Sequence, residues 1–213
     1  YQAGKNHTRT VWVMKCDIRK FFANIDHDML KTILAKHIHD SDVLWLLNEV
    51  IDSFHTPLHL NEVGCSGNGL PLGNLTSQLL VNVYMNEFDQ FVKHKLKVKH
   101  YIRYADDFVI MSTDKKYLEK TLLLVSDFLQ NELNLSLHEN KVSITTLASG
   151  VDFLGWVHFP DHRVLRTATK RRMIKRIRRH PTNETLQSYL GLLSHGNARK
   201  LKRAILAPAE IPY

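Results

Sequence analysis

The sequence has little cysteine and no long apolar run. Its two cysteines, Cys16 and Cys65, are too few for a disulfide framework or a zinc cage, which fits a reducing cytosol. No apolar run approaches the roughly 18 residues that span a membrane, and the first residues show no signal-peptide pattern. Internal repeats are absent, and the 13 histidines do not recur at the spacings of a transition-metal site. These absences favour a cytoplasmic protein without a membrane partner.

Negative charge is scarce in the last quarter of the chain. Lys and Arg total 29 against 21 Asp and Glu, a formal charge of +8 over 213 residues. Residues 1–162 hold 16 basic and 19 acidic residues, whereas residues 163–213 hold 13 basic and 2 acidic ones, a balance of +11. This surplus favours a polyanionic partner, and the alternative is a solvated basic helix face. The 44% hydrophobic content is enough for a packed core, in one domain with an appendage or in two small domains.

Hydrophobic periodicity predicts both strands and helices. Strand patterns cover residues 11–18, 100–104, 108–111, 142–147, 151–159 and 163–166. Helical patterns cover residues 29–38, 43–54, 77–97, 114–134, 168–179, 183–194 and 198–206. Asp26 or Asp28 can cap the first helix, and Ser77 the third. The segment 55–76 is predicted to be a long loop or hairpin, because it contains Pro57, Gly64, Gly67, Gly69, Pro71 and Gly73.

Three carboxylates lie at the ends of predicted strands. Asp17 ends the first strand, and Asp106 and Asp107 form an acidic turn between two strands. Acids are poor strand formers, and turn chemistry is the alternative explanation for a single Asp. Two adjacent like charges repel each other unless a cation is present, and hard oxygen ligands favour Mg²⁺ or Mn²⁺. Two such ions about 3.5–4 Å apart can activate a hydroxyl and stabilise a leaving phosphate oxygen.

Three sequence motifs in order resemble the palm of a reverse transcriptase. They are Asp17-Ile-Arg-Lys-Phe-Phe22, Gly69-Leu-Pro-Leu-Gly-Asn-Leu-Thr-Ser-Gln78 and Tyr104-Ala-Asp-Asp107, followed by Asp152-Phe-Leu-Gly-Trp156. The resemblance covers residues 11–200 and implies an α+β fold, the palm of a right-hand polymerase with a small antiparallel sheet backed by helices. It implies a palm over residues 1–160, with a primer-grip hairpin at 151–159, and a basic helical thumb over residues 161–213.

The resemblance also implies the roles of the charged residues. Asp17 and Asp106 would share two Mg²⁺ ions, with Mn²⁺ as a substitute, beside the backbone of Ile18, and Asp107 would ligate less directly. Lys141 would protonate the leaving pyrophosphate, and its alternative is a surface lysine at a strand start. Phe22 would be a steric gate against a 2′-hydroxyl, and its alternative is core packing beside Phe21.

Further residues would contact the substrates of such an enzyme. The resemblance implies a nucleotide-binding group of Arg19, Lys20, Phe21, Phe22, Leu72, Gly73 and Gln78. A second group would bind template and primer: Gly69, Pro71, Asn74, Ser77, Tyr104, Phe153, Leu154, Gly155, Trp156, Lys170, Arg171, Lys175 and Arg178. The implied partners are a template RNA, a primer or cDNA strand and a deoxynucleoside triphosphate (dNTP).

Two positions depart from the commonest motif. Many reverse transcriptases have Gln and Pro where this chain has Leu72 and Gln78, and the variant resembles the enzymes of diversity-generating retroelements. That resemblance implies reduced fidelity, a small basic accessory protein, and a cytoplasmic enzyme of a bacterium or phage. The thumb-like run from Ser188 to Asn197 resembles the same group.

Other interpretations are a group II intron or retron reverse transcriptase, or a non-catalytic RNA-binding module. Only 16 residues precede Asp17, too few for the fingers of such a polymerase. We therefore expect a truncated chain that polymerises weakly or not at all by itself.

Overall fold

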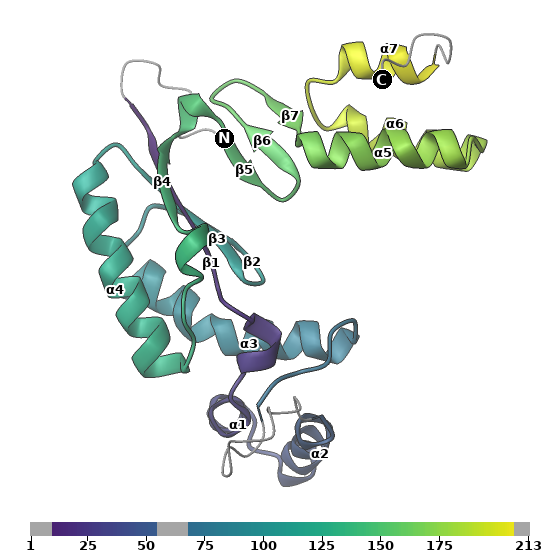
Figure 1. Cartoon of the computed structure of the whole chain (residues 1–213). Coiled ribbons are helices and arrows are strands. Elements are labelled where there is room, and N and C mark those ends of the chain that lie inside the picture. Colours follow the sequence, from purple (N-terminus) through teal and green to yellow (C-terminus); the bar gives the residue numbers. More distant parts are fainter. Residues whose placement is uncertain (1–9, 55–67, 207–213) are drawn as a thin grey trace. The chain divides into compact units, whose positions relative to one another are not determined.

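A computed structural model describes residues 10–54 and 68–206. These residues form two compact units, Val13–Ile144 and a second unit that holds residues 10–12 and 145–206 (Figure 1). Each unit has its own sheet and helices. The described residues therefore show an α+β chain of small antiparallel sheets and helices, as predicted.

The first unit is built on a four-stranded sheet in the order β2-β3-β1-β4. Its strands are β1 (Trp12–Asp17), β2 (His100–Tyr104), β3 (Asp107–Ser112) and β4 (Ser143–Thr146). Its α-helices are α1 (His27–Ala35), α2 (Ser41–Asp52), α3 (Leu75–Gln90) and α4 (Lys115–Leu133). The short 3₁₀-helices η2 (Phe21–Asn24) and η4 (Glu139–Lys141) and the π-helix η3 (Phe91–Lys95) complete the unit. Each predicted strand and helix of this unit is present, with ends shifted by a few residues.

An aromatic cluster joins the sheet to its helices. Phe88 of α3 is fully buried, and its ring centroid lies 5.1 Å from that of Phe108 on β3 and 6.2 Å from that of Phe128 on α4. Burying such rings is among the largest contributions to a core of this size. The cluster holds β3, and therefore the turn that precedes it, in a fixed place.

The helix starts show where local chemistry was decisive. Asp26 is the N-cap of α1, and its carboxylate accepts a hydrogen bond from the Met29 amide at 3.0 Å. The prediction that Ser77 caps a helix is wrong, because α3 begins at Leu75 after Asn74. Ser77 is the third residue of this helix, in its first turn and 1% exposed, where a small side chain fits. The predicted helix also ends sooner than residue 97, because α3 gives way to the wider turn η3 at Phe91.

The second unit packs three helices beside a three-stranded antiparallel sheet. The sheet order is β5-β6-β7, with strands β5 (Val151–Phe153), β6 (Trp156–His158) and β7 (Arg163–Leu165) after the turn η5 (Leu147–Ser149). The helices are α5 (Thr167–Arg179), α6 (Asn183–Ser194) and α7 (Arg199–Leu206). Their core comprises Met173, Ile177, Leu193, Ala198 and Ile205.

Candidate active site

Asp17 lies where β1 meets the acidic turn. It is the last residue of β1, and only 8% of it is exposed. The next amide, of Ile18, donates to the Asp106 carbonyl at 3.2 Å, and the Asp17 carbonyl accepts from the His138 amide at 2.8 Å. These backbone bonds bring together Asp17, the β2–β3 turn and the segment before η4.

The turn itself presents two half-buried carboxylates. Tyr104 pairs with Asp107 across the hairpin, so Asp106 lies in the turn, and Ala105 before it has a φ of 52°. Burial raises the pKa of Asp106, and the negative charge of Asp17 raises it further. Burial likewise raises the pKa of Asp107, while the positive charge of Lys15 lowers it. The three carboxylates therefore repel one another in a partly dry setting, which favours a neighbouring cation.

Lys141 supplies a cation to this group. Its ammonium donates to the two carboxylate oxygens of Asp17 at 2.9 and 3.0 Å. The hydrogen bond to Asp17 raises the pKa of Lys141. The Lys141 side chain is 54% exposed, so it can leave Asp17 for solvent or for another anion. The sequence allowed two interpretations of Lys141, a proton donor or a surface lysine. In the structure, the Lys141 ammonium contacts the Asp17 carboxylate.

The donor chemistry of this cluster fits a hard divalent cation. Carboxylate oxygens are the ligands that Mg²⁺ and Mn²⁺ prefer, and these ones are partly desolvated. Among the described residues, however, no three acidic, histidine or cysteine side chains already converge as a ligand set. Asp17 must exchange its bond with Lys141 before it can ligate a cation through both oxygens.

Two backbone hydrogen bonds join the segment after Asp17 to the glycine-rich loop, and we call this connection the strap. The Leu70 amide donates to the Phe22 carbonyl at 2.7 Å, and the Gly69 amide donates to the Ile25 carbonyl at 2.8 Å. His27, which is 2% exposed, places its Nε2 2.7 Å from the Gly69 carbonyl oxygen. Sequence reasoning missed His27, because its only local signal is a position in the first turn of a helix.

The predicted nucleotide-binding residues lie on both sides of this strap. Phe21 is buried in the core and meets Phe22 edge-on at 5.5 Å, whereas Phe22 is only half-buried. Arg19 and Lys20 are exposed before η2. In the loop, Leu72 is 79% exposed and Gly73 has a φ of +95°, a conformation that favours glycine. The exposed residues Asn74 and Gln78 continue this surface, with Pro71 half-buried beside them.

Arg103 is a second residue that the sequence did not single out. Its guanidinium donates to both carboxylate oxygens of Asp89, at 2.8 and 2.6 Å, and to the Ala105 carbonyl at 3.1 Å. The Tyr101 hydroxyl also donates to Asp89, at 2.6 Å. A bidentate pair of this kind is directional, so it ties the acidic turn to α3. Tyr104, predicted to contact the primer, is 65% exposed beside this turn.

The predicted primer-grip residues belong to the second unit. Phe153 and Trp156 are each 8% exposed, and the turn between them consists of Leu154, which is 47% exposed, and Gly155 with a φ of +80°. Arg163 stacks on Trp156, with its guanidinium carbon 5.0 Å from the ring centroid. Phe153 and Trp156 are therefore buried core residues, and the accessible part of the hairpin is its tip, Leu154 and Gly155.

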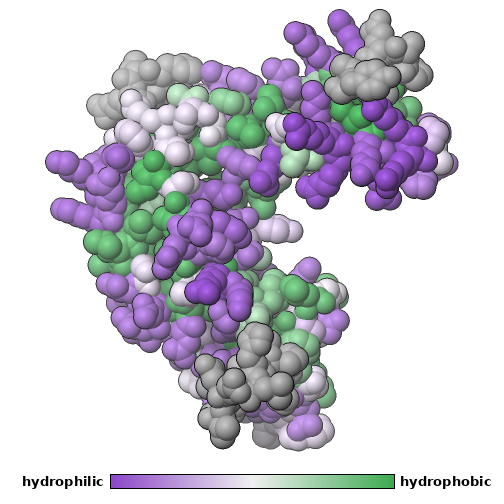
Figure 2. Space-filling view, in the orientation of Figure 1, coloured by the Kyte–Doolittle hydropathy of each residue, from purple (hydrophilic) through white to green (hydrophobic). Residues whose placement is uncertain are grey.

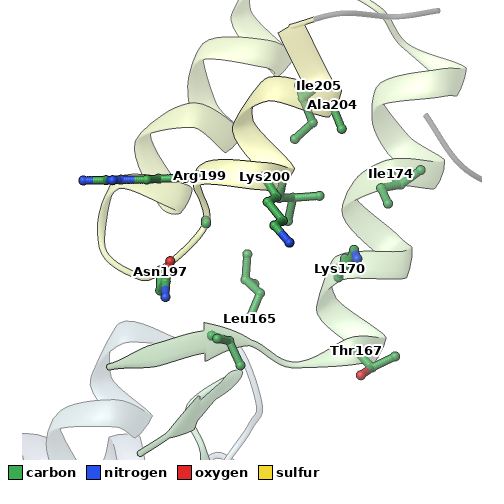
Figure 3. Close-up of a pocket in the computed structure, with 12 residues that line it drawn as sticks. Leu165, Thr167, Lys170, Ile174, Asn197, Arg199, Lys200, Ala204 and Ile205 are labelled. Carbon is green, nitrogen blue, oxygen red and sulfur yellow. The ribbon is translucent and has the colours of Figure 1, made fainter. Parts of the chain in front are cut away.

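The basic residues of α5 cover its outer surface. Lys170, Arg171, Lys175 and Arg178 are exposed, while Met173 and Ile177 are buried as predicted. The helix is a dense hydrophilic region in Figure 2. A cavity of about 720 Å³ lies between β7, α5 and α7; Lys170 lines it, and the side chain of Lys200 extends into it (Figure 3). No helix of the described residues is apolar over a length that would cross a bilayer.

Comparison with known proteins identifies related chains. The family model described as "Reverse transcriptase (RNA-dependent DNA polymerase)" matches residues 2–158. Protein YkfC of Escherichia coli K12 is 27% identical over 195 residues, and group II intron-encoded protein LtrA of Lactococcus lactis is 25% identical over 226 residues. Each alignment covers 76% of this chain, but 49% of YkfC and 36% of LtrA, so the chain spans half or less of these relatives.

Solved telomerase structures share the fold. Apo telomerase from Candida tropicalis, truncated from its C-terminal domain, aligns with a TM-score of 0.56 and 15% identity over 74% of this chain and 36% of that one. Telomerase from Candida albicans, in complex with a fragment of telomeric RNA, aligns with a TM-score of 0.59 and 11% identity over 76% and 31%. At these identities the likeness shows the fold alone, and it confirms the predicted fold class.

Proposed function

Because the chain belongs to the reverse transcriptase family of RNA-dependent DNA polymerases, we propose that it carries the catalytic palm and the thumb of such an enzyme. The reaction joins a dNTP to the 3′-hydroxyl of a primer under the direction of an RNA template. We assign residues 1–160 to the palm, with the grip hairpin at 151–159, and residues 161–213 to the thumb, although the hairpin belongs to the second compact unit. The single observation that carries the proposal is the contact of Lys141 with Asp17 beside the acidic turn, where the next amide, of Ile18, donates to the Asp106 carbonyl.

The carboxylates serve as the anionic side of the reaction centre. Enzymes of this family use a divalent metal ion. We assign two Mg²⁺ ions, replaceable by Mn²⁺, to Asp17, Asp106 and the Ile18 carbonyl, with Asp107 in a supporting place. When bound, such ions activate the attacking hydroxyl and stabilise the leaving phosphate oxygen. The chain itself holds the carboxylates in place through the Arg103–Asp89 pair and the Ile18–Asp106 bond.

Lys141 holds a proton at its Nζ beside this centre. Because the hydrogen bond to Asp17 raises the pKa of Lys141, the ammonium holds its proton while it contacts Asp17, and it becomes a stronger acid toward the leaving pyrophosphate once it moves away. Its exposed side chain allows it to move from Asp17 to that anion.

The nucleotide and the template contact the strapped loop. The exposed residues Arg19 and Lys20 neutralise the triphosphate, and Phe22 faces the sugar as a steric gate. Gly73 and the exposed residues around it, Leu72, Asn74 and Gln78, border the template–nucleotide pair. The primer strand contacts the grip tip and the basic face of α5, where Lys170, Arg171, Lys175 and Arg178 bind phosphates.

Primer extension by the purified protein tests this proposal. We expect the isosteric substitution Asp17→Asn to lower the extension rate on a primed RNA template by at least about 10²-fold. Unchanged extension by this variant would leave a binding-only role, such as an RNA-binding module, as the better explanation.

The retroelement class is a finer proposal that rests on two residues. Leu72 and Gln78 resemble diversity-generating retroelement enzymes, which implies error-prone copying, a small basic accessory protein and a cytoplasmic location in a bacterium or in phage-infected cells. Leu72 supports this class by its 79% exposure in the turn before α3, where it can contact the templating base. The alternative is a group II intron-type enzyme, favoured by the similarity to LtrA, or a retron enzyme.

Misincorporation assays separate these classes. We expect the Leu72→Gln variant to make fewer errors than the parent protein, above all at template adenines. An identical error spectrum for the two proteins would remove Leu72 from the account while leaving the polymerase assignment intact.

A further inference from the structure

Helix α5 carries two parallel basic ridges. The first ridge is Arg171, Lys175 and Arg178, and the second ridge is Arg172, Arg176 and Arg179. Both ridges have the spacing i, i+4, i+7, and at 100° per residue their centres lie about 100° apart around the helix axis. All six residues are exposed, because Met173, Ile174 and Ile177 turn the opposite side of the helix to the core.

The second ridge has no acidic partner within the described residues. Residues 145–206 contain only three acids, Asp152, Asp161 and Glu184, and Asp152 is paired with Arg166 at 2.8 Å. Like charges at i, i+4 destabilise a helix, so Arg172 and Arg176 repel each other. The helix dipole favours cations in the last turn, which accounts for Arg176 and Arg179 but not for Arg172.

The two ridges differ in their surroundings and in their chemistry. A groove of about 460 Å³ along α5 is lined by all three residues of the first ridge together with Lys170 and Ile174, and Arg179 is the one second-ridge residue in its lining. The second ridge contains arginine alone. A guanidinium binds phosphate through two parallel hydrogen bonds and stacks on unpaired bases, which a lysine ammonium does not do.

We propose that the second ridge binds an unpaired or looped RNA segment while the first ridge binds the primer–template duplex. The proposal rests on the proposed function, which places the duplex on the first ridge. A stiff duplex seated there contacts one side of a helix about 10 Å wide, and residues 100° further around the axis point away from it. The occupant of the second ridge is therefore another part of the RNA that is not being copied.

Two matched triple variants test the proposal. Arg172→Gln/Arg176→Gln/Arg179→Gln and Arg171→Gln/Lys175→Gln/Arg178→Gln each remove three charges from the same helix, so the change in overall charge is identical. The probes are a blunt RNA–DNA duplex and an RNA hairpin with a large unpaired loop and a stem too short to fill the first ridge, each titrated against the full-length protein at several salt concentrations. Circular dichroism checks that α5 remains helical in both variants.

The expected result is a crossed pattern. The second-ridge variant loses about 10-fold or more in affinity for the hairpin, with a salt slope reduced by about 2 to 3, and changes little toward the duplex. The first-ridge variant does the reverse, and saturating duplex leaves the hairpin bound. Competition between the probes, or equal losses in both variants, would overturn the proposal.

Other outcomes separate this proposal from the proposed function. A second-ridge variant that binds the hairpin like the parent overturns the inference and leaves an acidic protein as the better occupant. If the first-ridge variant keeps its duplex affinity while the second-ridge variant loses the hairpin, the thumb assignment is wrong and the RNA site stands.

Discussion

The Lys141 ammonium lies 2.9 and 3.0 Å from the two carboxylate oxygens of Asp17, although the residues are 124 positions apart in the sequence. Asp17 is a proposed metal ligand, and Lys141 is the proposed proton donor. An ammonium on both oxygens competes with a divalent cation for the same carboxylate. In the proposed site, the affinity for metal therefore depends on whether Lys141 stays on Asp17.

Removing the Lys141 charge should strengthen cation binding. The Lys141→Met variant frees both Asp17 oxygens and removes a repelling charge, so we expect the dissociation constant for Mn²⁺ to fall by about 2- to 5-fold. Titration of the protein with Mn²⁺, followed by electron paramagnetic resonance, measures the free ion directly. Lys141→Arg keeps the charge and should retain the parent affinity, and a weaker Mn²⁺ complex in Lys141→Met would contradict the competition.

The acidic turn should reduce stability at neutral pH in the absence of metal. Burial raises the pKa values of Asp106 and Asp107 in the folded protein, so the folded state favours their protonated forms. The stability that these groups contribute is present below their unfolded pKa and is lost as the pH rises through the folded pKa. In metal-free buffer at pH 7, Asp106→Asn/Asp107→Asn should therefore melt at a higher Tm than the parent.

The difference in Tm between Asp106→Asn/Asp107→Asn and the parent should depend on pH. It should shrink as the pH falls toward about 4, where the parent carboxyls also become neutral. A double variant that melts below the parent at pH 7, or a difference that does not change with pH, would show that burial is not the dominant cause.

His27 should stabilise the glycine-rich loop through one hydrogen bond. His27→Leu leaves the Gly69 carbonyl oxygen without its buried partner, which we expect to lower the free energy of unfolding by about 1–3 kcal/mol. His27→Gln keeps a donor of similar reach and should lose less. Urea unfolding of the three proteins measures the difference, and equal stabilities for Leu and Gln would remove the bond from the account.

Local chemistry explains which parts of the fold could be predicted. Of the two predicted caps, Asp26 and Asp28, the structure has Asp26, and the predicted acidic turn between β2 and β3 holds Asp106 while Asp107 begins β3. Ser77 shows the limit of such reasoning. Asn74 lies three residues earlier and belongs to the same group of preferred N-cap residues, so propensity alone could not choose between them.

Contacts between distant segments could not be predicted. The bond between His27 and Gly69 joins residues 42 positions apart, and neither residue carries a local signal of the other. Arg103 and Asp89 lie on a strand and a helix whose packing only the folded chain determines. The carboxylates of the candidate site could be predicted from their sequence motifs, whereas the residues that hold them in place were identified only in the structure.

Gly196 should be sensitive to any added side chain. A Cβ there would lie 2.1 Å from the Trp156 ring, so the ring or the loop must move in Gly196→Ala, at a cost of about 1–3 kcal/mol. Gly191 in α6 is the matched control, because a Cβ there meets nothing within 4 Å. Gly191→Ala should raise stability by about 0.5–1 kcal/mol, and thermal melts showing no loss in Gly196→Ala would contradict the packing of Trp156.

Extension of a primed RNA template by the full-length protein measures whether Asp106 and Asp107 belong to the reaction centre. We predict that Asp106→Asn/Asp107→Asn abolishes Mg²⁺-dependent incorporation of dNTPs, to below about 1% of the parent rate. Asp114→Asn is the control, because asparagine retains the cap of α4 and the site is unchanged. Extension by the double variant at the rate of the Asp114→Asn control would contradict the account.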